Sequence, residues 1–249
     1  MTSPLLSVEN LRKEFLLSTS GVGSLKTLLL WWRRKTYHHL EVLKGISFEV
    51  QRGECVAVVG RNGAGKSTLL SLLARVYKPS GGKITIRGRI APLLELGAGF
   101  HPDLTGYENI RFNAIILGLT RKQVDERIES IIAFSELRDH IHAPTRTYSS
   151  GMLARLGFSV AVHVDADVLI VDEVLAVGDY EFERKCYAKI EEFRQNGGTI
   201  LVVTHNMDAV RRVADRCIWL HLGRIRKEGS PEEVIPEYEA TPLDRDLDS

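Results

Sequence analysis

The sequence predicts an α/β fold in which a helical segment interrupts a series of alternating strands and helices. Short apolar runs at 55–59 and 168–171 have the length and composition of buried strands in a parallel sheet. Each is followed by a segment with helical periodicity, at 66–76 and 182–195. Between them, residues 107–165 show helical periodicity and few strand signals. We therefore expect one parallel α/β unit with a helical insertion.

Turn residues delimit the elements of the N-terminal part. Gln-Arg-Gly-Glu at 51–54 separates two strands, and Pro-Ser-Gly-Gly at 79–82 separates the first helix from the next strand. Loose alternation of apolar and polar residues at 5–11 indicates the first strand of the chain. The expected elements are the strands 5–11, 42–50, 55–59 and 83–87 and the helix 66–76.

Helical periodicity, and then a return of strands, defines the rest of the chain. The expected helices are 109–117, 121–134, 152–163, 182–195 and 207–214. The expected strands are 168–171, 199–203, 217–220 and 224–227, the last two joined as a hairpin. We expect 1–236 to form one domain with a helical subdomain at roughly 100–165. The acidic residues 237–249 are expected to form a loosely ordered tail.

The composition excludes several classes of protein. The chain has 249 residues, 44% of them hydrophobic, which is enough for one large domain without disulfides. Its three cysteines are far apart, so we expect buried, reduced thiols in a cytosolic protein. A net charge of +1 gives no general attraction to nucleic acid. No run reaches the roughly 18 apolar residues of a membrane span, and the start resembles no signal peptide.

A glycine-rich motif at 60–68, GRNGAGKST, follows an apolar strand directly and opens a helix. It matches G-x-x-x-x-G-K-[ST], in which backbone N–H groups turn inward around phosphates. Lys66 is expected to reach the β- and γ-phosphates, and the Ser67 hydroxyl to bind Mg²⁺. An ordinary glycine-rich turn would not explain the position between a buried strand and a helix. The expected nucleotide-binding residues are Gly60, Arg61, Asn62, Gly63, Ala64, Gly65, Lys66, Ser67 and Thr68.

The stretch ADVLIVDE, at 166–173, places two carboxylates at the end of an apolar strand. Asp172 is expected to hold Mg²⁺ through water, and Glu173 to act as general base for an attacking water. Such a base favours hydrolysis over phosphoryl transfer to another substrate. A solvated strand end is the alternative interpretation of this pair, and the nearby glycine-rich motif disfavours it. We therefore expect an ATPase or a GTPase.

A second anion site is expected where the helix 152–163 begins. In YSSGM, at 148–152, two hydroxyls and a glycine precede the helix. Unpaired backbone N–H groups at a helix start attract anions. The glycine-rich motif already provides a better phosphate cradle, so the presence of a second site requires an explanation.

Together, these motifs resemble those of the nucleotide-binding subunit of an ABC transporter, over about residues 5–230. The resemblance implies a P-loop NTPase with a RecA-like core, an antiparallel β subdomain and an inserted helical subdomain. It also implies ATP and Mg²⁺ as cofactors and a head-to-tail dimer of two copies. In that family a Leu-Ser-Gly-Gly-Gln signature contacts the γ-phosphate of ATP bound to the other copy. Here Ser149, Ser150 and Gly151 stand in that place, with Ser150 and Met152 departing from the family pattern.

Further positions match motifs of the same family. Asp179, in VGD, matches the aspartate loop that couples the two sites. His205, at a strand end, matches the switch histidine at the γ-phosphate, and the resemblance implies that it is catalytic together with Glu173. Tyr37 matches the aromatic residue that stacks on adenine, with His38 and Trp32 as neighbouring alternatives.

One position departs from the family. The usual glutamine loop contains no glutamine in this chain. Glu95 is the expected substitute, and a one-residue gap would instead align Leu96. An acidic residue there is still able to reach Mg²⁺ through water.

Three loops narrow the resemblance to exporters of bacterial surface polysaccharides. The stretches at 93–109, 148–158 and 172–179 are similar to those of ATPases that export O-antigen, capsule-like or teichoic acid polysaccharides. This implies a lipid-linked polysaccharide as cargo, an integral membrane permease as partner, and a peripheral position at the cytoplasmic face of the inner membrane. The alternatives are an ABC exporter subunit for another lipid or a drug, and a soluble ABC ATPase.

The stretch SLKTLLLWWRRK, at 24–35, is amphipathic, with basic residues beside an apolar face. It fits either a position at lipid headgroups or packing on its own domain, and the sequence leaves both open. Some members of the subfamily carry a C-terminal domain that binds the end of the polymer. We expect none on this chain, which stops at residue 249.

Overall fold

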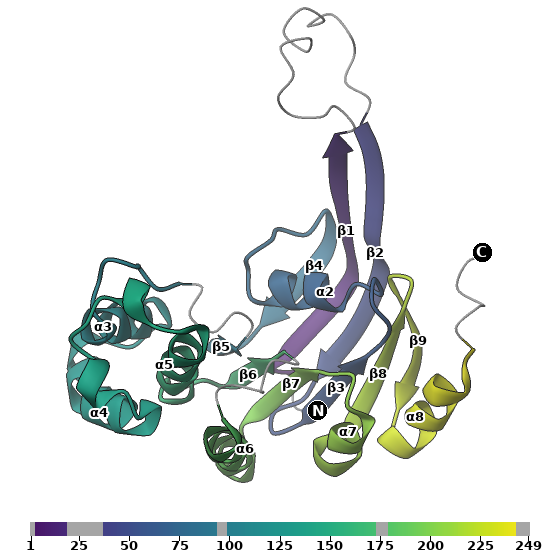
Figure 1. The fold of residues 1–249 in the computed structure, drawn as a ribbon. Helices are drawn as coiled ribbons and strands as arrows, with labels where there is room; N and C mark the ends of the chain where they lie inside the picture. Colours follow the sequence, from purple (N-terminus) through teal and green to yellow (C-terminus); the bar gives the residue numbers. More distant parts are fainter. Residues whose placement is uncertain (1–2, 19–36, 94–98, 173–178, 243–249) are drawn as a thin grey trace, which may run out of the picture.

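The computed structural model describes residues 3–18, 37–93, 99–172 and 179–242. Two β-sheets share a hydrophobic core, and helices pack around them (Figure 1). The strands are β1 (Leu6–Ser18), β2 (Tyr37–Val50), β3 (Cys55–Val59), β4 (Gly81–Ile86), β5 (Ile90–Leu93), β6 (Val168–Val171), β7 (Thr199–Val203), β8 (Arg216–His221) and β9 (Arg224–Gly229). The helices are α2 (Lys66–Leu73), α3 (Gly106–Ile116), α4 (Arg121–Ser135), α5 (Ser150–Val162), α6 (Tyr180–Gln195), α7 (Met207–Val213) and α8 (Pro231–Ala240).

The larger sheet has the strand order β5-β6-β7-β3-β8-β9, and the glycine-rich motif and Asp172 follow its strands β3 and β6. Its neighbouring strands are parallel except for β8 and β9. The apolar strands β3, β6 and β7 are almost fully buried, as expected for parallel strands covered on both faces. The carboxyl ends of neighbouring parallel strands lie together. Gly60 after β3, Asp172 after β6 and Thr204 after β7 are therefore at the same end of the sheet.

The smaller sheet packs on one face of the larger sheet, and α2 packs against both sheets. Its order is β2-β1-β4, with both pairs antiparallel. The ends of β1 and β2 form a long ribbon that extends away from the rest of the molecule (Figure 1). Leucines of α2 and side chains from both sheets make one buried cluster. This cluster fixes the helix that begins at the glycine-rich motif.

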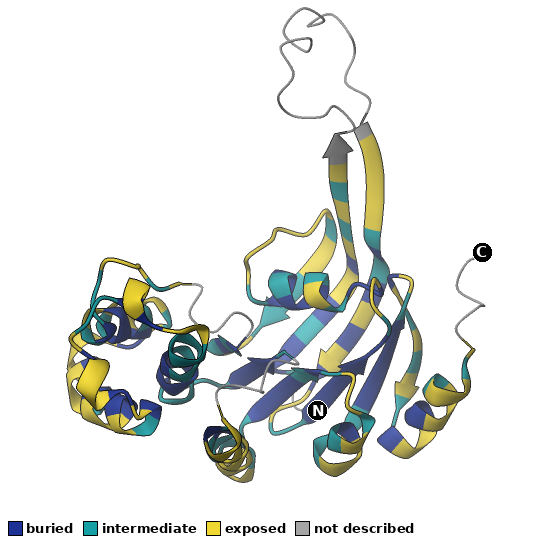
Figure 2. Ribbon diagram, in the orientation of Figure 1, coloured by how far each residue is buried: buried dark blue, intermediate teal, exposed yellow. Residues whose placement is uncertain are grey.

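Helices α6, α7 and α8 cover the opposite face of the larger sheet, and their outer sides are exposed (Figures 1 and 2). Phe182 and Cys186 of α6 pack against β3 and β6, and Val234 and Ile235 of α8 pack beside Trp219 of β8. The three cysteines are buried free thiols, as expected. Burial raises the pKa of each thiol to about 12.

Helices α3, α4 and α5 form a cluster with a hydrophobic core of its own. Capping boxes begin α3, where Thr105 pairs with Glu108, and α4, where Thr120 pairs with Gln123. These two caps place helix starts at Gly106 and Arg121. The helical periodicity of the sequence had already indicated helices in this region, with α3 beginning earlier than expected.

Two of the strands and α-helices given above, β5 and α8, were not predicted from the sequence, and one expectation was wrong. The edge strand β5 contains Pro92, which weakens a strand pattern and is tolerated at sheet edges. Helix α8 includes 237–240, which were expected to belong to a loosely ordered tail. Its acidic composition and internal Pro236 obscured the signal, whereas the cap formed by Ser230 and Glu233 starts the helix.

Several boundaries also differ. The strands β1 and β2 are longer than predicted, because the two strands pair from Leu6 and Val50 out to Ser18 and Tyr37. The helix α2 ends at Leu73, earlier than expected. No helix within the described part of the chain has the length and apolar character needed to cross a bilayer. The amphipathic stretch 24–35 lies outside the described residues.

Candidate functional site

The glycine-rich motif forms a tight loop between β3 and α2. A Cβ atom on Gly60 would lie 2.3 Å from the carbonyl oxygen of Leu220, and one on Gly65 would lie 2.8 Å from Cδ2 of Leu43. Gly65 is also the N-cap of α2, with φ of 103°, and no side chain caps the helix. The loop therefore requires glycine, and it leaves the start of α2 suited to an anion.

Lys66 folds back over this loop. Its Nζ donates hydrogen bonds to the carbonyl oxygens of Gly60 (2.6 Å) and Arg61 (2.9 Å). Burial lowers the pKa of the Lys66 ammonium, and the negative charge of Asp172 partly opposes this. Burial raises the pKa of Asp172, and Lys66 partly opposes this in turn. Both half-buried charges would gain from a ligand of opposite sign, an anion at Lys66 and a cation at Asp172.

A cavity of about 490 Å³ lies beside the loop, within the range of small-molecule sites. It is lined by Leu40, Glu41, Val42, Lys44, Arg61, Asn62, Gly63, Gly65, Lys66, Ser67, Thr68 and Leu222. One wall therefore comes from β2, the strand that begins at Tyr37. The side chain of Tyr37 lies outside those that the structure describes.

Asp172 and His205 line a second cavity, of about 390 Å³, between α6 and α7. Asp172 follows β6 and His205 follows β7. Because these strands are adjacent and parallel, both residues lie at the carboxyl ends of the sheet strands. The imidazole of His205 is exposed. Asn206 begins α7 by accepting a hydrogen bond from the Ala209 N–H (3.0 Å), and this cap fixes the direction of the chain after His205.

The predicted second anion site is the start of α5. Ser149 is the N-cap, and its Oγ accepts a hydrogen bond from the Met152 N–H (3.2 Å). A Cβ atom on Gly151 would meet only Ser149 Oγ, at 3.8 Å, so packing within the chain does not require glycine there. Ser149 and Ser150 are exposed. The described residues that line the cavity beside Lys66 include none from α5.

Asp179 is the N-cap of α6. Its Oδ1 accepts a hydrogen bond from the Phe182 N–H (3.0 Å), and its Oδ2 accepts one from Arg155 (2.5 Å). The Phe182 N–H is the main reason why the pKa of Asp179 is lowered. Glu173, Glu95 and its alternative Leu96 lie outside the described residues.

Sequence reasoning missed Arg155, and it did not predict the tertiary contact of Arg61. Arg155 connects Asp179 to the helix of the second anion site. Arg61, inside the glycine-rich loop, donates from Nη2 to the carbonyl oxygen of Thr241 (3.1 Å) after α8. No local pattern identifies either partner, because each contact joins segments that are distant in the sequence.

Comparisons with known proteins identify the family of this chain. The family model described as ABC transporter matches residues 43–176. The O-antigen export system ATP-binding protein RfbB of Klebsiella pneumoniae is 50% identical over 243 residues, which cover 94% of this chain and 97% of that protein. The teichoic acids export ATP-binding protein TagH of Lactococcus lactis is 43% identical over 94% of this chain and 50% of its own length.

Solved structures show the same fold. An ATP-binding subunit of an ABC transporter superposes with a TM-score of 0.74 at 24% identity and covers 96% of both chains. A dimeric ATP-binding cassette, described as a post-hydrolysis state with ADP and Pi, has a TM-score of 0.71 at 20% identity and covers 91% of this chain and 98% of its own. The chain therefore belongs to the ABC transporter family, within which it is an ATP-binding subunit that hydrolyses ATP.

Proposed function

We propose that this chain powers the export of a lipid-linked polysaccharide, of the O-antigen or teichoic acid type, together with a separate membrane subunit. The observation that carries the proposal is the 50% identity across 97% of an O-antigen export ATP-binding protein. The chain acts as a dimer bound peripherally at the cytoplasmic face of the bacterial inner membrane. Its net charge of +1 gives no reason to propose a nucleic acid partner.

ATP binds in the cavity beside the glycine-rich loop. Lys66 and the N–H groups at the start of α2 contact the β- and γ-phosphates, and Tyr37 stacks on adenine. The lowered pKa of Lys66 supports this assignment, since phosphate charge would stabilise the ammonium that burial disfavours.

Ser67 and Asp172 are the residues that would hold Mg²⁺. Both offer the oxygen ligands that this ion prefers, and a cation would stabilise the carboxylate whose pKa burial raises. No cluster of three or more acidic, histidine or cysteine side chains among the described residues could hold a metal. In this proposal, phosphate oxygens and water supply further ligands. When bound, Mg²⁺ neutralises charge on the β- and γ-phosphates.

Hydrolysis requires a base and a contact to the γ-phosphate. Glu173 takes a proton from the attacking water, whose oxygen bonds to the γ-phosphorus. The bond from that phosphorus to the bridging oxygen breaks, which yields ADP and inorganic phosphate. His205 contacts the γ-phosphate during this step, and its position beside Asp172 in one cavity supports that role.

Ser149, Ser150 and Gly151 contact the ATP of the second copy. Support comes from the exposure of Ser149 and Ser150 at the start of α5 and from the lining of the cavity beside Lys66, in which no described residue of α5 takes part. Asp179 couples the two sites, and Glu95 replaces the glutamine-loop residue.

The cargo is tested in cells that lack this chain. Undelivered lipid-linked glycan should accumulate inside them, and wild-type protein should restore surface glycan. Lys66→Ala should not restore it, whereas Lys122→Ala, an exposed lysine on α4, should. Normal surface glycan together with a defect in drug or lipid efflux would show that another substrate is exported.

The arrangement of the dimer is tested with two inactive variants. Gly151→Asp should fold, because the space around Gly151 is open, yet it should block the anion site. Mixed dimers of Lys66→Ala and Gly151→Asp keep one intact composite site only if α5 serves the other copy. Recovery of ATPase activity on mixing is expected. No recovery from two correctly folded variants that still dimerise would contradict the assignment of α5 to the other copy's ATP.

A further inference from the structure

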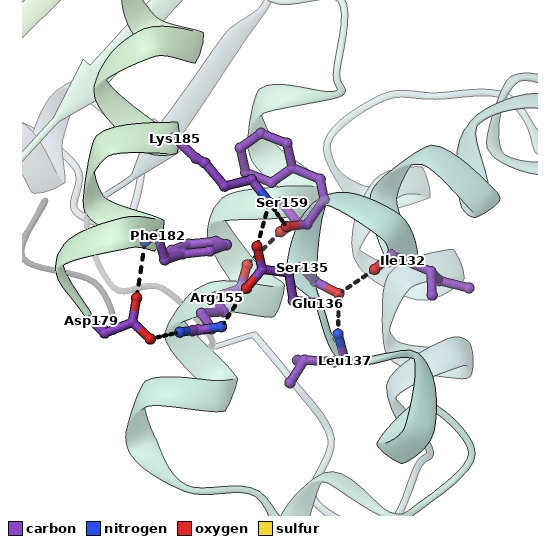
Figure 3. A network of polar contacts seen from close by, with 10 residues as sticks. Ile132, Ser135, Glu136, Leu137, Arg155, Ser159, Asp179, Phe182 and Lys185 are labelled. Carbon is purple, nitrogen blue, oxygen red and sulfur yellow. Dashed lines mark hydrogen bonds and ion pairs between the residues drawn. The ribbon is translucent and has the colours of Figure 1, made fainter.

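A polar network joins the helices α4, α5 and α6 around Arg155 (Figure 3). Arg155 lies on α5 and donates to Glu136 (3.0 Å) and to Asp179 (2.5 Å). Lys185 of α6 donates to the other oxygen of Glu136 (2.6 Å). Glu136 is the C-cap of α4, and Asp179 is the N-cap of α6. Arg155 therefore connects the end of one helix to the start of another.

Aromatic rings hold this network in place. Phe134, Phe158 and Phe182, one from each of the three helices, lie with ring centroids 5.7 to 6.3 Å apart. The Arg155 guanidinium lies 4.8 Å from the centroid of the Phe182 ring, and its side chain is only 16% exposed. A charge in this setting is screened less than one at the surface, and a planar guanidinium suits two carboxylates at once. These contacts therefore constrain the relative orientation of the three helices more than an exposed ion pair would.

Asp179 contacts two helices, one through each of its carboxylate oxygens. Oδ1 begins α6 by accepting from Phe182, and Oδ2 accepts from the helix that starts with Ser149. A shift of α5 relative to α6 must therefore break a contact of Asp179 or move this carboxylate.

We propose that Arg155 and Glu136 are positioning residues, which fix the α5 start at Ser149–Gly151 relative to Asp179. Neither residue contacts ATP in this arrangement. They act through the orientation in which α5 presents its first turn to the other copy. This inference rests on the proposed role of Ser149 and Gly151 across the dimer interface.

Arg127 provides a matched comparison. It also ties α4 to the region after α5, because it donates to Asp165 (2.7 Å) and to the carbonyl oxygen of His163 (2.8 Å). It makes these contacts at the far end of α5 from Ser149, and Asp179 is not among its partners. A purely structural role for ion pairs between helices would affect Arg127 and Arg155 alike.

The experiment measures ATP affinity, kcat and thermal stability of the purified chain. In Arg155→Met the Kd for ATP should stay within twofold, because the glycine-rich loop is untouched, while kcat should fall tenfold or more. A misplacement of about 1 Å can lower a rate on the order of 10²-fold. Arg155→Lys should recover part of kcat, since an ammonium keeps the charge but cannot engage both carboxylates as a fork. Arg127→Met should keep kcat within twofold.

Asp179→Asn separates charge from capping, because asparagine also caps helices well. If Arg155 acts through Asp179, the double variant should have a kcat no lower than the slower single variant. Should Arg155→Met fail to fold, Arg155→Lys and Glu136→Gln carry the same test. A kcat within twofold of wild type in folded Arg155 variants, or an equal loss in Arg127→Met, would overturn the proposal.

The outcome is separable from the proposed function. The ATPase assay uses no cargo, so export of a different substrate would leave this result unchanged. Mixed dimers test the trans arrangement independently. Recovery of ATPase activity there, combined with normal kcat in the Arg155 variants, would reject only the positioning role.

Discussion

Gly60 and Gly63 are both glycines of the nucleotide loop, yet the structure requires them for different reasons. A Cβ atom on Gly60 would lie 2.3 Å from a backbone oxygen of β8, closer than real contacts allow. Gly63 has open space around it but a left-handed backbone, with φ of 82°. Glycine is required at position 60 by the close approach of two chain segments, and at position 63 by the local backbone conformation alone.

This difference predicts unequal losses of stability. Gly60→Ala should lower the free energy of unfolding by about 3 kcal/mol or more, because a backbone atom cannot move aside easily. Gly63→Ala should cost about 1 kcal/mol, the strain of a left-handed residue. Urea unfolding without nucleotide measures both. Equal losses would mean that the contact between Gly60 and Leu220 relaxes at little cost.

At the scale of elements, α8 shows how packing overrides a weak local signal. The segment is acidic and contains Pro236, yet Val234 and Ile235 are fully buried against the sheet. Trp219 of β8 makes an edge contact with Tyr238 of α8, with ring centroids 5.5 Å apart. The helix therefore completes the hydrophobic cover of β8 and β9 and is part of the folded unit.

Truncating a buried side chain of α8 should destabilise the whole chain. Ile235→Ala is expected to cost about 2–5 kcal/mol in free energy of unfolding, the usual loss for a buried isoleucine. Glu239→Ala removes an exposed ion pair with Arg211 and should cost about 0.5 kcal/mol or less. Denaturant unfolding distinguishes the two. A small loss for Ile235→Ala would indicate that α8 detaches without affecting the core.

At the scale of the whole molecule, Asp167 ties together segments that are far apart in the sequence. It accepts hydrogen bonds from the Arg89 N–H (2.9 Å) before β5 and from the Arg52 side chain (3.0 Å) before β3. Gly88 packs against it so closely that a Cβ atom would lie 2.7 Å from its Oδ2. This carboxylate therefore connects residues that precede β3, β5 and β6 of the larger sheet.

Stability should therefore fall in acid, partly through Asp167. Its pKa lies below the usual 3.8, chiefly because the Arg89 N–H donates to it. A lowered pKa in the folded state gives stability that is present above the unfolded pKa and is lost as the pH falls through the folded pKa. Asp172 acts in the opposite sense, since burial raises its pKa and its contribution is lost as the pH rises.

Urea unfolding between pH 6 and pH 3 tests this, and the acid loss should be shallower in Asp167→Asn than in wild type. Asp139→Asn, at an exposed aspartate of the helical cluster, should follow the wild-type slope. Identical slopes in all three proteins would exclude Asp167 from the acid response.

The sequence by itself determined the local parts of the site. A pattern of neighbouring residues identifies the loop of Gly60 to Thr68, the strand end at Asp172 and the helix start at Ser149. A glycine backbone, an apolar run and a capping hydroxyl follow short-range rules that a linear pattern displays. For the same reason the apolar strands β3, β6 and β7 were predicted with their correct bounds.

Only the tertiary structure decided which of these parts meet. The contacts of Arg155 with Glu136 and Asp179, and of Arg61 with Thr241, join residues that no period or motif connects. The pairing of β5 at the sheet edge and the burial of α8 likewise depend on surfaces supplied by distant segments. Such contacts are selected by the free energy of packing the whole chain, which local propensity does not encode.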